Sequence, residues 1–175
     1  MASTIIVEDG TGVADANAYV DAAGARAYAA LRGITLPAAP ESGVDPVEPW
    51  LILASDYLES KCYIFTQATL TQGLSWPRKP RCWDSNPADY LMPTKVINAQ
   101  CQLVIEQFNG ISLLPTTPGG ADGQFVVREK VDVIETTYSE KLGTLSTPTM
   151  PAVDALLREY VVYGGGSARI GTVRV

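Results

Sequence analysis

A cluster of basic and aromatic residues lies in the middle of the chain. Between Trp76 and Trp83 the sequence reads WPRKPRCW, so Arg78, Lys79 and Arg81 lie between two tryptophans. Proteins that bind single-stranded nucleic acid combine cations, which contact phosphates, with aromatic rings, on which the bases stack. The segment from Trp76 to Trp83 is therefore the first candidate for a binding site.

The same segment also has a purely structural interpretation. Pro77 and Pro80 exclude a regular helix or a central strand, so the segment can be a loop held by its tryptophans, with solvated charges. Its three cations would neutralise about three phosphates, which gives a log–log salt slope of only about −2 for a single strand. The whole chain is acidic, with 13 basic and 19 acidic residues and a net charge of −6. Both quantities favour the structural interpretation.

Residues suited to catalysis or metal binding are few. The chain has no histidine, which removes the commonest general base and the commonest metal ligand. Cys62, Cys82 and Cys101 lack the spacing of a zinc site, and we expect them to be buried free thiols. No glycine run has the setting of a phosphate loop. Two carboxylates can meet in almost any fold, but we expect neither an enzyme nor a bound cofactor.

Four amphipathic segments are expected to form the helices that position these residues. They are residues 21–31, a segment that begins at Pro49, residues 94–108 and a segment that begins at Pro151. Asp21 is a suitable N-cap, Gly33 and Gly110 are suitable stops, and proline is favoured in a first turn. The apolar stripes expected to form the core are Trp50, Leu53, Ala54, Tyr57 and Leu58; Ile97, Cys101, Val104, Ile105 and Phe108; and Val153, Leu156, Leu157, Tyr160 and Val161.

A strand-like segment lies between the last two helices. Phe125 to Tyr138 partly alternates apolar and polar residues, which predicts one long strand or a β-hairpin near 124–138. Such a hairpin either packs on the helices or projects toward a neighbouring subunit, and the sequence does not choose. The predicted fold class is mainly α, a small bundle of about four helices with a β-hairpin or extended strands. We expect one body, residues 1–163.

The C-terminal residues 164–175 are expected to form an extended arm. They begin with three glycines, then carry two arginines and no acid among residues of strand character. A frayed end is the usual fate of a terminus, whereas an arm of this kind can add a strand to a partner. We favour the arm, and its expected contact residues are Arg169, Ile170, Val173, Arg174 and Val175.

Composition indicates protein partners rather than a membrane. Apolar residues make up 46% and charged residues 18% of the chain, where about 25% charged is typical, so apolar surface is left over for partners. The longest apolar stretch, Trp50 to Ala54, is far shorter than the roughly 20 residues of a membrane span. The N-terminus lacks the early basic residues of a secretory signal.

Several segments of the chain resemble those of a protein family found in tailed bacteriophages. They are Ile5–Gly12, Asp15–Val20, Leu74–Arg78, Val127–Val131 and Pro151–Leu157. Together with the glycine-rich, arginine-containing end, they follow the order of the family over nearly the whole chain. The family is often labelled DnaT-like single-strand-binding proteins, and its members resemble the head–tail connectors, or adaptors, that join a phage portal to the tail.

The resemblance implies a structural protein of the virion neck that is made in the host cytoplasm. It implies a homo-oligomer, a ring of twelve copies under the portal, that continues the DNA channel without specific DNA binding. The arm would dock on the portal protein, and tail, nozzle or stopper proteins would bind below. The family motif assigns no catalytic residue. The segment around Trp76, Arg78, Lys79, Arg81 and Trp83 would then pack at subunit or partner contacts.

Charge favours the adaptor over the alternative, a single-stranded-DNA-binding accessory protein of replication. DNA slides through the neck during packaging and ejection, so a lumen that bound phosphates would slow it. An acidic chain, with a pI near 4.6, avoids this resistance. Weak contacts of about 1 kcal/mol per copy also add up over a ring of linked copies.

Overall fold

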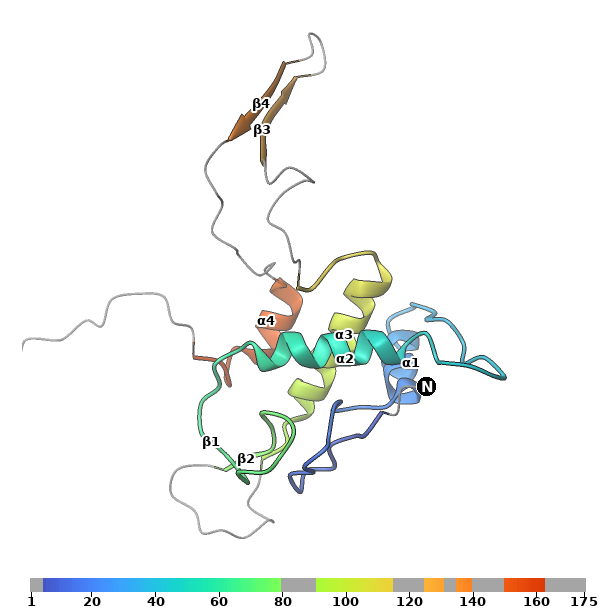
Figure 1. Ribbon diagram of the computed structural model, residues 1–175, viewed down its shortest axis with the longest axis vertical. Helices are drawn as coiled ribbons and strands as arrows, with labels where there is room; N and C mark the ends of the chain where they lie inside the picture. Colours follow the sequence, from blue (N-terminus) through green and yellow to red (C-terminus); the bar gives the residue numbers. More distant parts are fainter. Residues whose placement is uncertain (1–4, 80–90, 115–124, 131–134, 140–149, 163–175) are drawn as a thin grey trace, which may run out of the picture.

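The body of the protein is built from helices. The structure, a computed structural model, describes residues 5–79, 91–114, 125–130, 135–139 and 150–162. Within these residues it contains the helices α1 (Ala22–Ala30), α2 (Glu48–Glu59), α3 (Thr94–Phe108) and α4 (Pro151–Leu157) (Figure 1). The strands form two antiparallel pairs, β1 (Thr66–Gln67) with β2 (Arg78–Lys79), and β3 (Phe125–Lys130) with β4 (Glu135–Ser139). The predicted fold class is confirmed.

The helices begin and end at the residues that the sequence marks. The Asp21 carboxylate accepts a 2.7 Å hydrogen bond from the Gly24 N–H and so caps α1. Gly33, with φ of 73°, and Gly110, with φ of 88°, adopt the left-handed conformation that follows a helix end. Proline lies in the first turn of both α2 and α4, where its missing N–H costs nothing.

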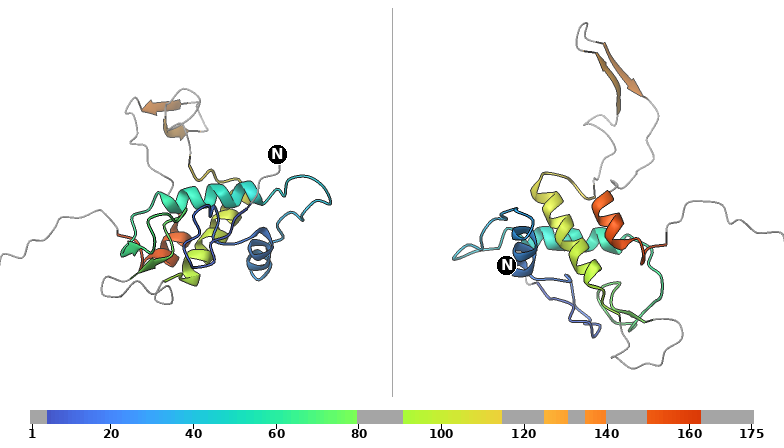
Figure 2. Two further views of the ribbon diagram at one scale, coloured as in Figure 1. Left: turned by 60° about the horizontal axis from the view of Figure 1, so that its bottom comes forward. Right: turned by 180° about the vertical axis from the view of Figure 1, so that it is seen from behind.

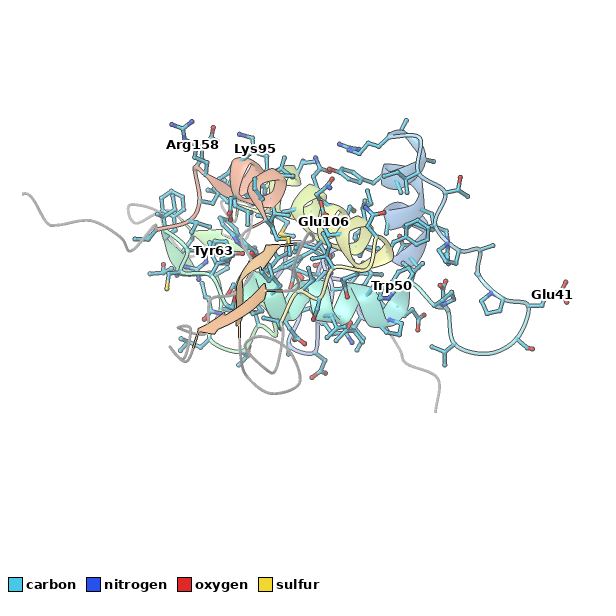
Figure 3. All side chains as sticks on the ribbon, turned by 90° about the horizontal axis from the view of Figure 1, so that it is seen from above. Glu41, Trp50, Tyr63, Lys95, Glu106 and Arg158 are labelled. Carbon is cyan, nitrogen blue, oxygen red and sulfur yellow. The ribbon has the colours of Figure 1, made fainter. Side chains whose placement is uncertain are left out.

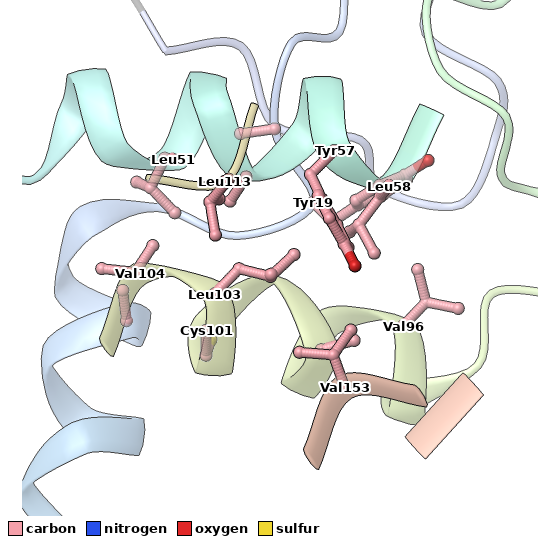
Figure 4. Close-up of a cluster of buried hydrophobic side chains, with 14 of the residues drawn as sticks. Tyr19, Leu51, Tyr57, Leu58, Val96, Cys101, Leu103, Val104, Leu113 and Val153 are labelled. Atoms are coloured by element: carbon pink, nitrogen blue, oxygen red, sulfur yellow. The ribbon is translucent and has the colours of Figure 1, made fainter. Parts of the chain in front are cut away.

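Helix α3 is the centre of the core, because α1, α2 and α4 all pack on it. Figure 4 shows side chains of α2 and α3 facing each other, with Val153 of α4 on the far side of α3. Each fully buried side chain of this size stabilises the fold by about 1.5–3 kcal/mol relative to exposure. The buried residues at these contacts include Leu51, Tyr57, Leu58, Val96, Leu103, Val104, Val153 and Leu157.

The buried face of α2 and α3 differs from the predicted apolar stripes. Leu53 is 46% exposed and Phe108 41% exposed, whereas Ser55 and Gln100 are buried. The cause is a polar contact: Gln100 Nε2 donates to the Ser55 hydroxyl (2.8 Å) and to the Leu51 carbonyl (3.0 Å). This buried pair has its hydrogen bonds satisfied within the contact between the two helices, while Leu53 and Phe108 lie at its partly exposed rim.

The strand-like segment forms a hairpin rather than one long strand. Phe125 pairs with Ser139 and Lys130 with Glu135, and the register shifts between Val126 and Arg128. Figures 1 and 2 draw β3 and β4 apart from the helices in every view. The hairpin predicted near 124–138 is thus confirmed as a pair of strands that stands away from the helical body.

Two further predictions concern the C-terminal arm and membrane spans. The arm, residues 164–175, lies outside the described residues and stays a prediction, and so does the division of the chain into body and arm. None of the helices that the structure describes is long and apolar enough to cross a membrane.

Candidate functional site

The segment from Leu74 to Lys79 enters the core instead of lying on the surface. Trp76 has no exposed surface. Its ring forms a pair with Tyr63, at a centroid distance of 5.6 Å, and a pair with Tyr160, at 5.5 Å, both in the T-shaped geometry that aromatic pairs prefer. Trp76 is therefore buried within the chain itself, and the predicted role of the segment in subunit or partner contacts stays a prediction. Its ring is already covered on both sides by the protein itself.

Arg78 is bound to the chain around it. Its Nε donates to the Ser75 carbonyl (2.9 Å), and its Nη1 donates to the carbonyls of Phe65 (2.5 Å) and Ile64 (3.3 Å). Its backbone N–H and C=O both pair with Leu91. Burial lowers the pKa of this guanidinium, although it remains charged at any neutral pH. Arg78 joins three stretches of chain and has few donors left for a phosphate.

Glu59 connects the segment to the N-terminal part of the chain. Its carboxylate accepts hydrogen bonds from the Tyr19 hydroxyl (2.7 Å), the Ser75 N–H (2.9 Å) and the Ser75 hydroxyl (2.6 Å). The Tyr19 hydroxyl in turn accepts a hydrogen bond from the backbone N–H of Trp76 (3.3 Å). Burial, with the neighbouring Glu59 charge, raises the pKa of Tyr19 and keeps it a neutral donor. We call Tyr19, Glu59, Ser75 and Trp76 the Glu59 network.

The acidic N-terminal motif is also structural. Glu8 is only 3% exposed, and its carboxylate accepts from the N–H groups of Gly10 (2.9 Å), Gly12 (2.9 Å) and Val13 (2.8 Å). Three backbone donors satisfy a buried carboxylate without a cation. The loop that Glu8 holds together lies against the mid-chain segment, since Val13 O accepts from the Gly73 N–H (3.0 Å).

Gly73 shows how closely these two segments approach. A Cβ atom at Gly73 would lie 2.5 Å from the Ala16 carbonyl oxygen and 2.8 Å from the Ala14 carbonyl oxygen. Only glycine permits this approach without moving backbone. Parts of the chain that carry the family resemblance, near residues 5–20 and 74–78, therefore pack against each other.

The remaining predicted site residues have different fates. Lys79 is half-buried and pairs with Thr66 in the β1–β2 ladder. Arg81 and Trp83 lie outside the described residues, as do the arm residues Arg169, Ile170, Val173, Arg174 and Val175. The structure thus brings Trp76 and Arg78 together as neighbours, with the Arg78 guanidinium 5.9 Å from the Trp76 ring centroid, but in the core.

The thiols do not form a reactive centre in the part of the chain that is described. Cys101 is buried as predicted, and burial raises its pKa to about 12, which makes it a poor nucleophile at neutral pH. Cys62 is exposed, so the prediction of burial is wrong there, because it follows the end of α2 at the surface. Cys82 lies outside the described residues. Among those residues no group of three potential ligands could hold a metal ion.

Four residues whose side chains hold these contacts were not among the predicted site residues: Tyr19, Glu59, Gln72 and Gln100. Gln72 Nε2 donates to the Leu74 and Pro77 carbonyls (2.6 and 3.0 Å), and its Oε1 accepts from the Thr69 N–H (2.9 Å). This side chain holds the turn that carries Leu70, whose side chain is fully exposed. No local sequence pattern identifies such residues, because their hydrogen-bond partners are either distant in the sequence or are backbone groups.

Fold and site together define a small helix-rich protein with a projecting hairpin, in which the conspicuous motifs build the core. The chain belongs to the family described as "Putative DnaT-like ssDNA binding protein", whose model matches residues 3–175. No curated protein and no solved structure matches the chain significantly. By its wording, the family description favours single-stranded-DNA binding over an adaptor role.

Proposed function

We propose that this protein is a non-enzymatic structural adaptor of a tailed phage that joins the portal to the tail as a ring of copies. The observation that carries the proposal is the burial of Trp76 together with the fixed position of Arg78. The described part of the segment that most resembles a single-strand-binding site, Trp76 to Lys79, supports the fold. A protein through which DNA must slide has no use for an exposed stacking surface.

The hairpin agrees with this proposal. A two-stranded ribbon alone is only marginally stable in water, and β3 and β4 stand away from the helices (Figure 1). A neighbouring copy or a partner protein would supply the packing that the helical body does not. Twelve-fold symmetry, the portal and the tail proteins as partners, and the location in the virion neck come from the resemblance to connectors.

The direct test is the native mass of the protein, alone and after mixing with the portal ring of the same phage. A shift to a complex that contains a full ring of copies is expected. A monomer in both samples would contradict the adaptor. Removal of residues 167–175 is expected to leave a folded body that no longer attaches to the portal, and retained attachment would contradict a role for the arm.

The second candidate is single-stranded-DNA binding, which the family description favours. Because Trp76 is covered and Arg78 is bound to carbonyls, such binding would depend on Lys79 together with Arg81 and Trp83. Titration with oligo-dT at physiological salt tests it. Binding that the Lys79→Ala/Arg81→Ala variant loses and the control Lys95→Ala keeps would replace the adaptor by this function. Arg78→Ala is unsuitable, because it would disturb the fold.

A further inference from the structure

Charged side chains such as Lys95 and Arg158 point outward from the helical body in Figure 3. The N-terminal segment, residues 5–8, presents apolar side chains to solvent instead, since Ile6 is 37% and Val7 36% exposed. In Figure 1 this dark blue segment lies below helix α2. The segment also offers backbone groups, and these decide what kind of partner it can bind.

The N-terminal segment is one strand of a short parallel pair. The Ile6 carbonyl accepts hydrogen bonds from the N–H groups of Asn17 (2.9 Å) and Ala18 (3.3 Å). The Glu8 N–H donates to the Ala18 carbonyl (2.9 Å), and the Ile6 N–H donates to Oδ1 of Asn17 (2.8 Å). These bonds hold the backbone of the segment extended before any partner binds, so little conformational entropy remains to be lost there.

The outer edge of this strand is unpaired. In an extended chain the N–H and C=O groups of successive residues point to opposite sides. Ile6 and Glu8 face the neighbouring strand, so Ile5 and Val7 face away from it. Within the described residues, the N–H and C=O groups of Ile5 and Val7 form no hydrogen bond. Four backbone groups, in the alternation that a β-ladder needs, are thus left without a partner.

The outer edge also lacks the features by which proteins prevent strand addition, which are charged side chains, proline and bulges. Two of the described strands have such features. Strand β2 consists of Arg78 and Lys79, and β3 contains a register shift and ends in the charged residues 128–130. Ile5 to Val7 is instead an unbroken β-branched run, the residue type that suits a strand. An unprotected apolar edge of this kind is a template for another strand.

The sequence around this edge is acidic. The first 25 residues contain four acids and no lysine or arginine. Asp9, two residues after Val7, is exposed. Hydrogen bonds from Thr11, chiefly from its hydroxyl, lower the pKa of Asp9, so it is ionised at neutral pH. Asp9 forms no ion pair within the described residues, which leaves its charge for a cation on the added strand.

We propose that the edge Ile5–Val7 binds an extended, basic segment of a partner protein by strand addition. Main-chain hydrogen bonds to Ile5 and Val7 hold the added strand, its β-branched side chains cover Ile6, and its arginine or lysine pairs with Asp9. Only an extended backbone presents N–H and C=O groups at the spacing of this edge, so a helix does not fit it. The inference does not rest on the adaptor role.

A synthetic peptide tests the strand addition. The probe is a fluorescein-labelled hexapeptide of alternating valine and threonine with an arginine at each end, and fluorescence anisotropy follows its binding to the full chain. Saturable binding is expected. N-methylation of the central residues removes their donors without changing their side chains, and is expected to weaken binding about tenfold or more. Glutamate in place of both arginines is also expected to weaken it about tenfold.

Variants of the chain locate the bound peptide. Val7→Pro removes an N–H that no described residue uses, so the fold is expected to remain while binding weakens about tenfold. Val7→Thr keeps this N–H and the β-branched shape, and is expected to bind as the wild type does. Asp9→Asn is expected to weaken binding about threefold, whereas the matched control Asp56→Asn, at an exposed residue of α2, is expected to have no effect.

Hydrogen exchange shows whether the edge is free before a partner binds. In the full chain alone, the Val7 amide is expected to exchange faster than the Glu8 amide, which is bonded to Ala18, and to slow when the peptide is added. A Val7 amide that is protected without peptide would assign the edge to another part of the chain or to a second copy, and would overturn the inference. No peptide binding, equal binding of the N-methylated peptide, or unchanged Val7 exchange in the complex would overturn it as well.

Discussion

Two tryptophans in similar aromatic pairs serve different ends of the molecule. Trp76 has no exposed surface and forms T-shaped pairs with two tyrosines, and it belongs to the Glu59 network. Trp50 meets one phenylalanine edge and borders exposed Leu53 and Phe108. All three pairs are T-shaped, with interplanar angles of 62° for Trp50 and of 75° and 86° for Trp76, so this class of pair does not separate a buried tryptophan from a half-buried one. The two differ in how far the rest of the chain covers them: Trp76 is fully buried, whereas Trp50 is half-buried.

Substitution of the two tryptophans by alanine gives the largest expected difference. Trp76→Ala removes a fully buried ring and is expected to lower the free energy of unfolding by about 3–5 kcal/mol. Trp50→Ala removes a half-buried ring and is expected to cost about 1 kcal/mol. Urea unfolding followed by circular dichroism measures both values. Equal losses would remove the distinction between a core tryptophan and a surface one.

Glu59 provides the next test, on the Trp76 side alone. Glu59→Ala leaves the Tyr19 hydroxyl and both Ser75 donors without their acceptor, and is expected to cost about 1–3 kcal/mol. Glu106→Ala is the matched control on α3, because its carboxylate accepts one hydrogen bond, from Gln102, and about 0.5 kcal/mol is expected. The same urea titration measures both variants. A Glu59 variant as stable as the control would mean that the network does not stabilise the fold.

Acid pH is expected to act at the contact between Arg26 and Asp45. Asp45 accepts a 2.6 Å hydrogen bond from Arg26, which also donates to the Pro37 carbonyl. The hydrogen bond from Arg26 lowers the pKa of Asp45. A lowered carboxyl pKa stabilises the fold above the unfolded value of about 3.9, and this contribution is lost as the pH falls through the folded value. Asp45→Asn is expected to lower the free energy of unfolding at pH 7 by about 1 kcal/mol or less, and so to lower Tm. Near pH 2 the Tm of the variant is expected to equal that of the wild type. A constant Tm difference over this pH range would contradict the assignment.

Leu53 is expected to give the smallest change in stability. Leu53→Ser lies on an exposed helix face, so the free energy of unfolding is expected to change by about 0.5 kcal/mol or less. Ala27→Ser, on the exposed face of α1, is the control. A large loss of stability in Leu53→Ser would place this side chain in the core after all.

The helices and the hairpin could be predicted from the sequence because their signals are local. Asp21, the prolines of α2 and α4, and Gly33 and Gly110 mark helix ends by their own backbone preferences. The segment near 124–138 shows the alternation of a strand. These features need no knowledge of the rest of the chain, and the structure confirms them.

The site could not be predicted in the same way because its contacts are long-range. Whether Trp76 is buried depends on Tyr63 and Tyr160, and whether Gln100 faces inward depends on Ser55. Composition marks the WPRKPRCW segment equally well as a surface loop or as a core strap. The apolar stripes failed at Leu53 and Phe108 for the same reason, since Ser55 and Gln100 are buried through a contact between two helices that are distant in the sequence.

The hydrogen bond between the N-terminal segment and α3 has a consequence for synthesis of the chain. The Tyr19 N–H donates to the Gln100 side chain (2.8 Å), 81 residues further on. Contacts that close such long loops form late, and a chain leaves the ribosome from its N-terminus. The hydrogen bond from Tyr19 to Gln100 therefore cannot form until α3 has been translated. During this interval the nascent chain exposes the apolar residues around Tyr19, and this is the stage at which a chaperone would have most to bind.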